Sequence, residues 1–146
     1  MLKFFIAGIM QGSMAHGIHG QDYRPRLKRI VTTAFPDAKV FCPFETHPES
    51  VGYDEANGRR TFFDLIERAG DSDVLIAYLP SASMGTAVEM WRAYNAGRVV
   101  VAISRLTSNW AVKFLAHKVC ATLDDFELFV ASNGLGKLIQ ERGPST

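Results

Sequence analysis

The sequence predicts a single-domain α/β fold, in which a parallel five-stranded sheet carries helices on both faces. Apolar runs of strand length alternate along the chain with amphipathic stretches of helical period. These runs are continuously apolar, as is typical of parallel strands buried on both faces. The length of 146 residues suits one domain with a full core. Right-handed crossovers between parallel strands then place helices on both sides of the sheet.

The expected elements follow the apolar runs and the turn residues between them. Strands are predicted over residues 3–8, 39–42, 74–79, 99–103 and 119–121. Helices are predicted over residues 22–35, 62–69, 87–96, 110–117 and 123–132, with Gly97 as a C-terminal cap. Residues 43–58 are expected to form a long polar connection, and loops of that length are often functional. Four aromatic residues are assigned to the core: Trp91, Tyr94, Phe126 and Phe129.

Composition indicates an ordinary soluble protein of the cytoplasm. Hydrophobic residues make up 47% of the chain, charged residues 21%, and the net charge is +1, so neither a nucleic-acid polymer nor a membrane is an expected partner. No apolar run approaches the roughly 18 residues of a membrane span. Cys42 and Cys120 lie far apart and form no CxxC pattern, so neither a disulfide nor a zinc site is predicted.

Three connections are expected to converge at the carboxyl ends of the strands, where ligands bind in such folds: residues 8–21, 43–58 and 80–85. The first carries four glycines but matches neither GxGxxG nor GxxxxGK[ST], which disfavours ATP hydrolysis of the P-loop kind. It is either a flexible connector or a substrate loop that offers backbone N–H groups.

The histidines do not predict a metal site. His16, His19, His47 and His117 are scattered and lack acidic or cysteine partners at ligand spacing. They are expected to be surface or loop residues, although His16 and His19 could meet a phosphate from the first loop.

The segment 83–89, Ser-Met-Gly-Thr-Ala-Val-Glu, carries the strongest functional signal. It joins a buried strand to a helix, so its small residues expose backbone N–H groups that favour anions. Glu89 lies four residues after Gly85, on the same helical face. A carboxylate beside an anion cradle suggests chemistry on a sugar or sugar phosphate. The helix N-terminus is expected to lower the pKa of Glu89 and keep it ionised as a nucleophile. The alternative is a glutamate that only complements the helix dipole.

In order and spacing, four segments together resemble the nucleoside 2-deoxyribosyltransferase superfamily, which includes 2'-deoxynucleoside 5'-monophosphate N-hydrolases. The segments are residues 8–21, 64–65, 72–77 and 83–89, and the resemblance spans about residues 3 to 110. It implies a flavodoxin-like sheet, a homodimer or higher homo-oligomer, and cleavage of the N-glycosidic bond of a nucleoside or nucleotide. Hydrolysis and transfer to another base are both open, and no metal or redox cofactor is implied.

The resemblance also implies roles for individual residues. Glu89 matches the nucleophile that attacks the anomeric carbon, and Asp64 matches the aspartate that contacts the leaving base and helps to protonate it. From the residues alone, Asp64 could equally be a solvated helix residue. Ser83 and Gly85 match the phosphate contacts. The candidates for a polar residue supplied by a neighbouring subunit are Ser104, Ser108 and Asn109, of which Asn109 is preferred.

In the first loop, Gly8, Ile9 and Met10 match the segment that packs against the base. Gln11 stands where the nucleotide hydrolases carry an arginine that holds the 5'-phosphate, so the choice between nucleoside and monophosphate stays open.

Two other functions are alternatives to cleavage of a nucleoside or its monophosphate. A cytokinin-type phosphoribohydrolase shares the pattern of residues 85–89 but usually has a paired glycine before it. A non-catalytic nucleotide or nucleotide-sugar binding module would bind at the same place and release no base.

Overall fold

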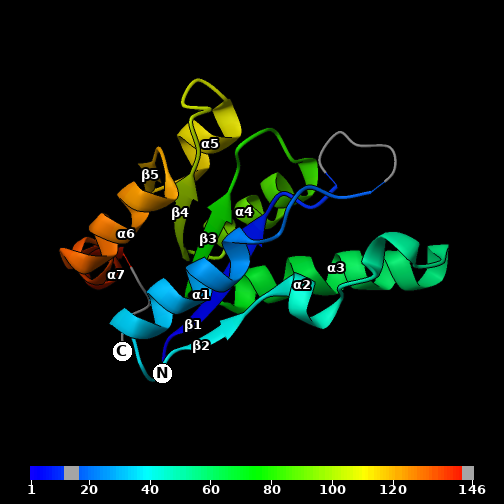
Figure 1. The fold of residues 1–146 in the computed structure, drawn as a ribbon, viewed down its shortest axis with the longest axis horizontal. Coiled ribbons are helices and arrows are strands. Elements are labelled where there is room, and N and C mark those ends of the chain that lie inside the picture. Colours follow the sequence, from blue (N-terminus) through cyan, green and yellow to red (C-terminus); the bar gives the residue numbers. More distant parts are fainter. Residues whose placement is uncertain (12–16, 143–146) are drawn as a thin grey trace.

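A parallel five-stranded sheet forms the centre of the molecule, in the order β2-β1-β3-β4-β5 (Figure 1). The computed structural model describes residues 1–11 and 17–142. The strands are β1 (Lys3–Gly8), β2 (Lys39–Phe41), β3 (Val74–Tyr78), β4 (Val99–Ile103) and β5 (Lys118–Cys120). This topology confirms the predicted α/β class and its flavodoxin-like strand order.

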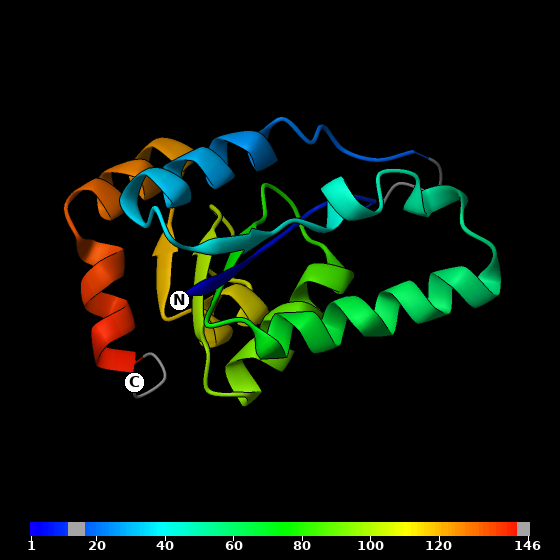
Figure 2. The ribbon, with the colours of Figure 1, turned by 90° about the horizontal axis from the view of Figure 1, so that it is seen from below.

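Helices form one layer on each face of the sheet (Figures 1 and 2). The first layer holds α1 (Tyr23–Ala34), α6 (Leu123–Ala131) and α7 (Gly134–Arg142), and the second holds α3 (Glu55–Asp71), α4 (Met84–Asn95) and α5 (Trp110–Leu115). Two short pieces, α2 (Pro43–Thr46) and the 3-10 turn η1 (Ser50–Gly52), connect β2 to α3. Among the described residues, no helix combines the length and apolarity that crossing a bilayer requires.

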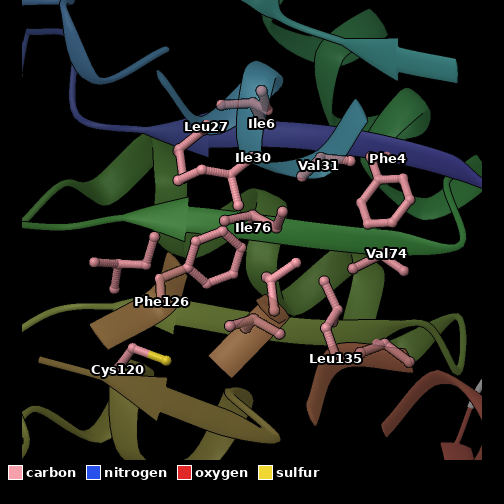
Figure 3. Packing of buried hydrophobic residues seen from close by; sticks show 14 of the residues in the cluster. Phe4, Ile6, Leu27, Ile30, Val31, Val74, Ile76, Cys120, Phe126 and Leu135 are labelled. Carbon is pink, nitrogen blue, oxygen red and sulfur yellow. The ribbon is translucent and has the colours of Figure 1, made fainter. Parts of the chain in front are cut away.

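Toward the carboxyl ends of the central strands, the two faces of the sheet are packed with side chains of different size. Under α1, α6 and α7 the core is bulky, as Figure 3 shows for Phe4, Ile76 and Phe126. Under α3 and α4 the central strands present a row of alanines, Ala7, Ala77 and Ala102, which are paired in register. Small side chains let a helix backbone approach the sheet closely, so α4 packs against the alanine row at this end of the strands.

Several predicted boundaries and placements were wrong. The connection 43–58 is not a loop throughout, because Asp54 caps α3 by accepting from the Asn57 N–H at 2.8 Å and the helix begins at Glu55. Helix α7 was missed because two glycines interrupt its sequence, yet it forms where Leu135 enters the core. Trp91 and Tyr94 are exposed on α4, contrary to their assignment to the core, whereas Phe126 is buried as predicted.

The strand order creates a crevice at the carboxyl ends of β1 and β3. The chain leaves β1 for β2 on one side and later fills the other side with β3, so the connections after these two strands diverge. Helix α3 flanks the crevice, and both views show its N-terminal half projecting beyond the sheet. Gly97, just past the end of α4, has a positive φ of 73°, as its predicted role at the helix end requires.

Candidate active site

A cavity of about 410 Å³ lies in this crevice. Its walls come from the end of β1, the segment around η1, helix α3 and the first two turns of α4. The lining residues are Gly8, Met10, Gln11, Ser50, Val51, Tyr53, Gly58, Thr61, Phe62, Leu65, Ile66, Ser83, Met84, Gly85, Thr86 and Glu89. The structure therefore brings together Glu89, Ser83, Gly85, Gly8, Met10 and Gln11 from the residues predicted for the site.

Glu89 stands in the second turn of α4, which begins after the N-cap Ser83. Its Oε2 atom is buried and has no hydrogen-bond partner among the described residues. An unpartnered buried carboxylate oxygen is costly to a fold, so it needs an explanation other than stability. Glu89 itself lines the cavity, so its carboxyl group lies where a nucleophile or a ligand contact is needed.

The pKa of Glu89 is raised to about 8, because burial removes water from the carboxylate, and the positive charge of Arg24 offsets part of that rise. The expectation that the helix N-terminus would lower this pKa is therefore wrong. Glu89 lies beyond the first turn of α4, where the effect of the helix dipole has faded. Desolvation is the larger effect.

Arg24 is a buried cation whose hydrogen bonds to the described residues all go to uncharged acceptors. Its guanidinium donates to the Ile6 carbonyl at 3.0 Å, the Gly8 carbonyl at 3.3 Å and the Gln21 Oε1 at 2.6 Å. Buried charges are normally balanced by a charge of opposite sign, and the carboxylate of Glu89 supplies one when it ionises. Arg24 thus binds the carbonyls at the end of β1 and, through its charge, also acts on the ionisation of Glu89 in the cavity wall.

The start of α4 offers polar groups to the cavity. Ser83 Oγ accepts from the Thr86 N–H at 3.3 Å and lies 2.9 Å from Thr86 Oγ1. The backbone N–H groups of Met84 and Gly85 belong to the first turn, where a helix provides no internal acceptor. They lie on the same wall as Glu89, so an anionic or hydroxyl group could bind beside the carboxylate.

The first loop contributes unequally. A Cβ at Gly8 would lie 2.5 Å from Tyr23 Oη, so this close approach requires glycine. Ile9 is buried and does not line the cavity; its carbonyl accepts from Tyr23 Oη at 3.1 Å. His19 donates its backbone N–H to the Met10 carbonyl at 2.6 Å, which brings these two residues of the first loop together. His16 lies outside the described residues.

Two further predicted residues, besides Ile9, do not line the cavity of this chain. Asp64 is half exposed on α3 and accepts from Arg68 Nε at 2.8 Å, while its neighbour Leu65 lines the cavity in its place. One residue along a helix turns a side chain by about 100°, which explains the difference. Asn109 accepts from the Ala111 and Val112 N–H groups as the N-cap of α5 and lines a separate cavity of about 150 Å³.

The segment between β2 and α3 lies at the cavity, as its predicted convergence with the other two loops indicates, but the sequence assigned no role to the individual residues in it. Tyr53 lines the cavity, and its hydroxyl oxygen lies 2.8 Å from His47 Nδ1. The polar and aromatic composition of residues 43–58 was the available signal, but no spacing linked these two residues to Glu89. Within residues 1–11 and 17–142, no group of three His, Cys, Asp or Glu residues could hold a metal ion, and both cysteines are free and buried.

No family model and no curated protein matches the chain. Solved structures, in contrast, do align with its fold. A conserved protein from Enterococcus faecalis aligns with a TM-score of 0.64 at 20% identity, over 91% of this chain and 99% of its own. A 2-deoxyribosyltransferase from Bacillus psychrosaccharolyticus aligns with a TM-score of 0.65 at 18% identity, over 86% of this chain and 90% of its own.

A flavoenzyme, the NAD(P)H:(acceptor) oxidoreductase FerB from Paracoccus denitrificans, aligns with a TM-score of 0.57 at 9% identity, over 99% of this chain and 100% of its own. These structural alignments establish a shared fold, and the two enzymes among the matched structures have different chemistry. Function must therefore be argued from the residues of the cavity. The chain has a flavodoxin-like α/β fold that matches the 2-deoxyribosyltransferase over most of both chains.

Proposed function

We propose that this protein cleaves the N-glycosidic bond of a nucleoside or nucleoside 5'-monophosphate, with Glu89 as the nucleophile. The observation that carries the proposal is the Glu89 carboxylate at the cavity wall, where Oε2 is buried and has no hydrogen-bond partner among the described residues. The similarity in fold to a 2-deoxyribosyltransferase supports the reaction class.

The two ends of the cavity differ in a way that suits a nucleoside. Helix α3 supplies an apolar wall, from Phe62, Leu65 and Ile66, against which a flat base can pack. The start of α4 supplies Ser83 and the first-turn N–H groups, which suit a sugar hydroxyl or a 5'-phosphate. The volume of about 410 Å³ lies in the usual range of small-molecule sites.

The proposed chemistry proceeds through a covalent intermediate. A carboxylate oxygen of Glu89 bonds to the anomeric carbon, and the C–N bond breaks with its electron pair passing to the base nitrogen. Water, or the nitrogen of a second base, then attacks the same carbon and releases the carboxylate. Arg24 helps Glu89 to ionise from behind the cavity, because its positive charge opposes the effect of burial on the Glu89 pKa.

A panel of nucleosides and their 5'-monophosphates tests the proposal, with free base measured by chromatography, with and without an acceptor base. We expect base release by the wild type and a loss of roughly 10⁴-fold or more in kcat for Glu89→Gln. Glu141→Gln, on the exposed side of α7, is the matched control and should retain full activity. A folded Glu89→Gln variant with wild-type activity would exclude Glu89 as the nucleophile.

The second candidate is a binding module that releases no base. The raised pKa of Glu89 favours it, since a neutral carboxyl is a hydrogen-bond donor to a ligand rather than a nucleophile. The position of Asp64 outside the cavity also removes one predicted proton donor. Saturable nucleotide binding without base release across the whole panel would select this alternative.

We further infer that the protein assembles as a homo-oligomer through the exposed face of α4 and α5. Large apolar side chains gather there, and the exposed side chains are Met84, Val88, Trp91, Trp110 and Phe114. Trp110 is 78% exposed and packs edge-on against Phe114, with ring centroids 5.8 Å apart. A stripe of this kind usually marks a protein interface.

Trp110→Glu should therefore convert the oligomer to monomers in light-scattering measurements. A wild type that is already monomeric would contradict the inference.

A further inference from the structure

A histidine and a tyrosine form a pair beside the cavity that none of the roles above uses. Tyr53 lines the cavity, and its hydroxyl oxygen lies 2.8 Å from Nδ1 of His47. The two rings meet edge-on, with centroids 5.8 Å apart and an interplanar angle of 87°. A short hydrogen bond reinforced by ring contact fixes the direction of the tyrosine side chain.

The backbone holds both partners from each side. The His47 N–H donates to the Pro43 carbonyl at 2.8 Å, at the end of α2, and the Tyr53 N–H donates to the Ser50 carbonyl at 3.1 Å, at the end of η1. Asp54, next in the chain, is the N-cap of the long helix α3. Tyr53 is thus positioned by regular structure, which is what a preorganised contact to a ligand needs.

Among the described residues, helix α3 offers few polar groups to the cavity wall against which a base would pack. The α3 wall is apolar apart from Thr61, and Asp64 is turned toward Arg68 on the outside. A base that leaves with the electron pair of the C–N bond gains negative charge and needs a hydrogen-bond donor. The hydroxyl of Tyr53 is a donor and an acceptor at once, so one interaction with His47 leaves capacity for another.

We propose that the Tyr53 hydroxyl hydrogen-bonds the leaving base, and that His47 is a positioning residue that orients this hydroxyl. The inference rests on the proposed function and deepens it by assigning the group that recognises the base. When His47 Nδ1 carries a hydrogen and donates it, the Tyr53 hydroxyl is free to donate its own hydrogen to the base. His47 acts only through Tyr53.

The test compares substrates whose leaving groups differ in their need for a donor. Natural nucleosides or monophosphates leave as anionic bases, whereas N7-methylated purine counterparts leave as neutral ones. We expect Tyr53→Phe to lower kcat/KM by roughly 10- to 100-fold for natural substrates, as for a hydrogen bond to a developing charge. For the N7-methylated substrates the loss should stay below about threefold, since little charge develops on the base.

His47→Ala should give the same leaving-group pattern at smaller size. The double variant should be no worse than Tyr53→Phe alone, because His47 has no effect without the hydroxyl. Tyr94→Phe is the matched control, since Tyr94 stacks on His117 outside the cavity with ring centroids 5.6 Å apart. It should change neither class of substrate. Thermal unfolding of each variant separates loss of fold from loss of contact.

Equal losses on both substrate classes, or no loss on either, overturn the assignment of Tyr53. Glu89→Gln separates this failure from failure of the proposed function, because it should abolish turnover of both classes. If the wild type releases no base at all, the proposed function fails, and the Tyr53 assignment is decided by calorimetric binding of free bases. Weaker binding by Tyr53→Phe would then support it, and equal affinity would overturn it.

Discussion

The two faces of the sheet use the same central strands differently. At neighbouring register positions, β1, β3 and β4 present Ile6, Ile76 and Val101 toward α1, α6 and α7, and Ala7, Ala77 and Ala102 toward α4. The bulky row fills a core and stabilises the fold. The alanine row lets α4, which carries Glu89, lie close to the carboxyl ends of the strands. The candidate site therefore lies on the face where the sheet carries the smaller side chains of the alanine row.

The first face nevertheless contributes to the site through Arg24. Its guanidinium extends from α1 to the carbonyls at the end of β1 and acts electrostatically on Glu89. The bulky face thus supplies a fixed charge from a rigid core, while the alanine face supplies the group that titrates. Each part of this comparison can be tested separately.

The pH dependence of activity should show the largest effect. Because burial raises the pKa of Glu89 to about 8, kcat/KM should rise with pH up to that value and fall about tenfold per unit below it. Arg24→Gln removes the opposing charge, so the acid limb should move to higher pH, whereas Arg24→Lys should leave it near the wild-type position. A flat profile between pH 5 and 8 would show that no ionised Glu89 is needed.

Changing the size of a side chain on either face of the sheet should show the next largest effect. Ala77→Ile places extra volume under α4, so we expect a loss of stability of roughly 1–3 kcal/mol and a fall in kcat/KM of about 10²-fold as Glu89 shifts. Ile76→Val, one residue away on the other face, should cost roughly 0.5–1.5 kcal/mol and leave kcat/KM unchanged. Chemical denaturation and steady-state kinetics measure both. Equal effects on activity would show that the alanine row has no special role.

The pH dependence of stability should show the smallest effect. The folded pKa of Glu89 is raised from 4.5 to about 8, so the folded state favours the protonated carboxyl. This stabilisation is complete below pH 4.5 and is lost as the pH rises through about 8. Glutamine cannot ionise, so Glu89→Gln should gain stability over the wild type progressively across this window, by about 1 kcal/mol or more at pH 8. The control Glu141→Gln should show no such gain at any pH, and a constant difference between Glu89→Gln and the wild type would contradict the burial of the charge.

Local patterns were sufficient for the architecture but not for every element. Continuous apolar runs located all five strands, because the residue period of a buried strand is visible in the chain. Helix α7 escaped detection because its glycines weaken the helical signal, and only Leu135, Leu138 and Ile139 packing against the core make it stable. The polar composition of residues 43–58 predicts a loop, whereas the cap at Asp54 extends α3 into this segment.

For the candidate site, the sequence by itself identified what lies next to a strand end. Gly8, Ser83, Gly85 and Glu89 follow buried strands closely, and parallel strands bring such positions to one edge of the sheet. The tertiary structure decided what depends on direction and surroundings. It turned Asp64 out toward Arg68, brought Tyr53 to the cavity with His47 as its hydrogen-bond partner, and raised the pKa of Glu89 by burial. Sequence spacing fixes which residues share an edge, whereas desolvation and side-chain direction arise only once distant segments have packed.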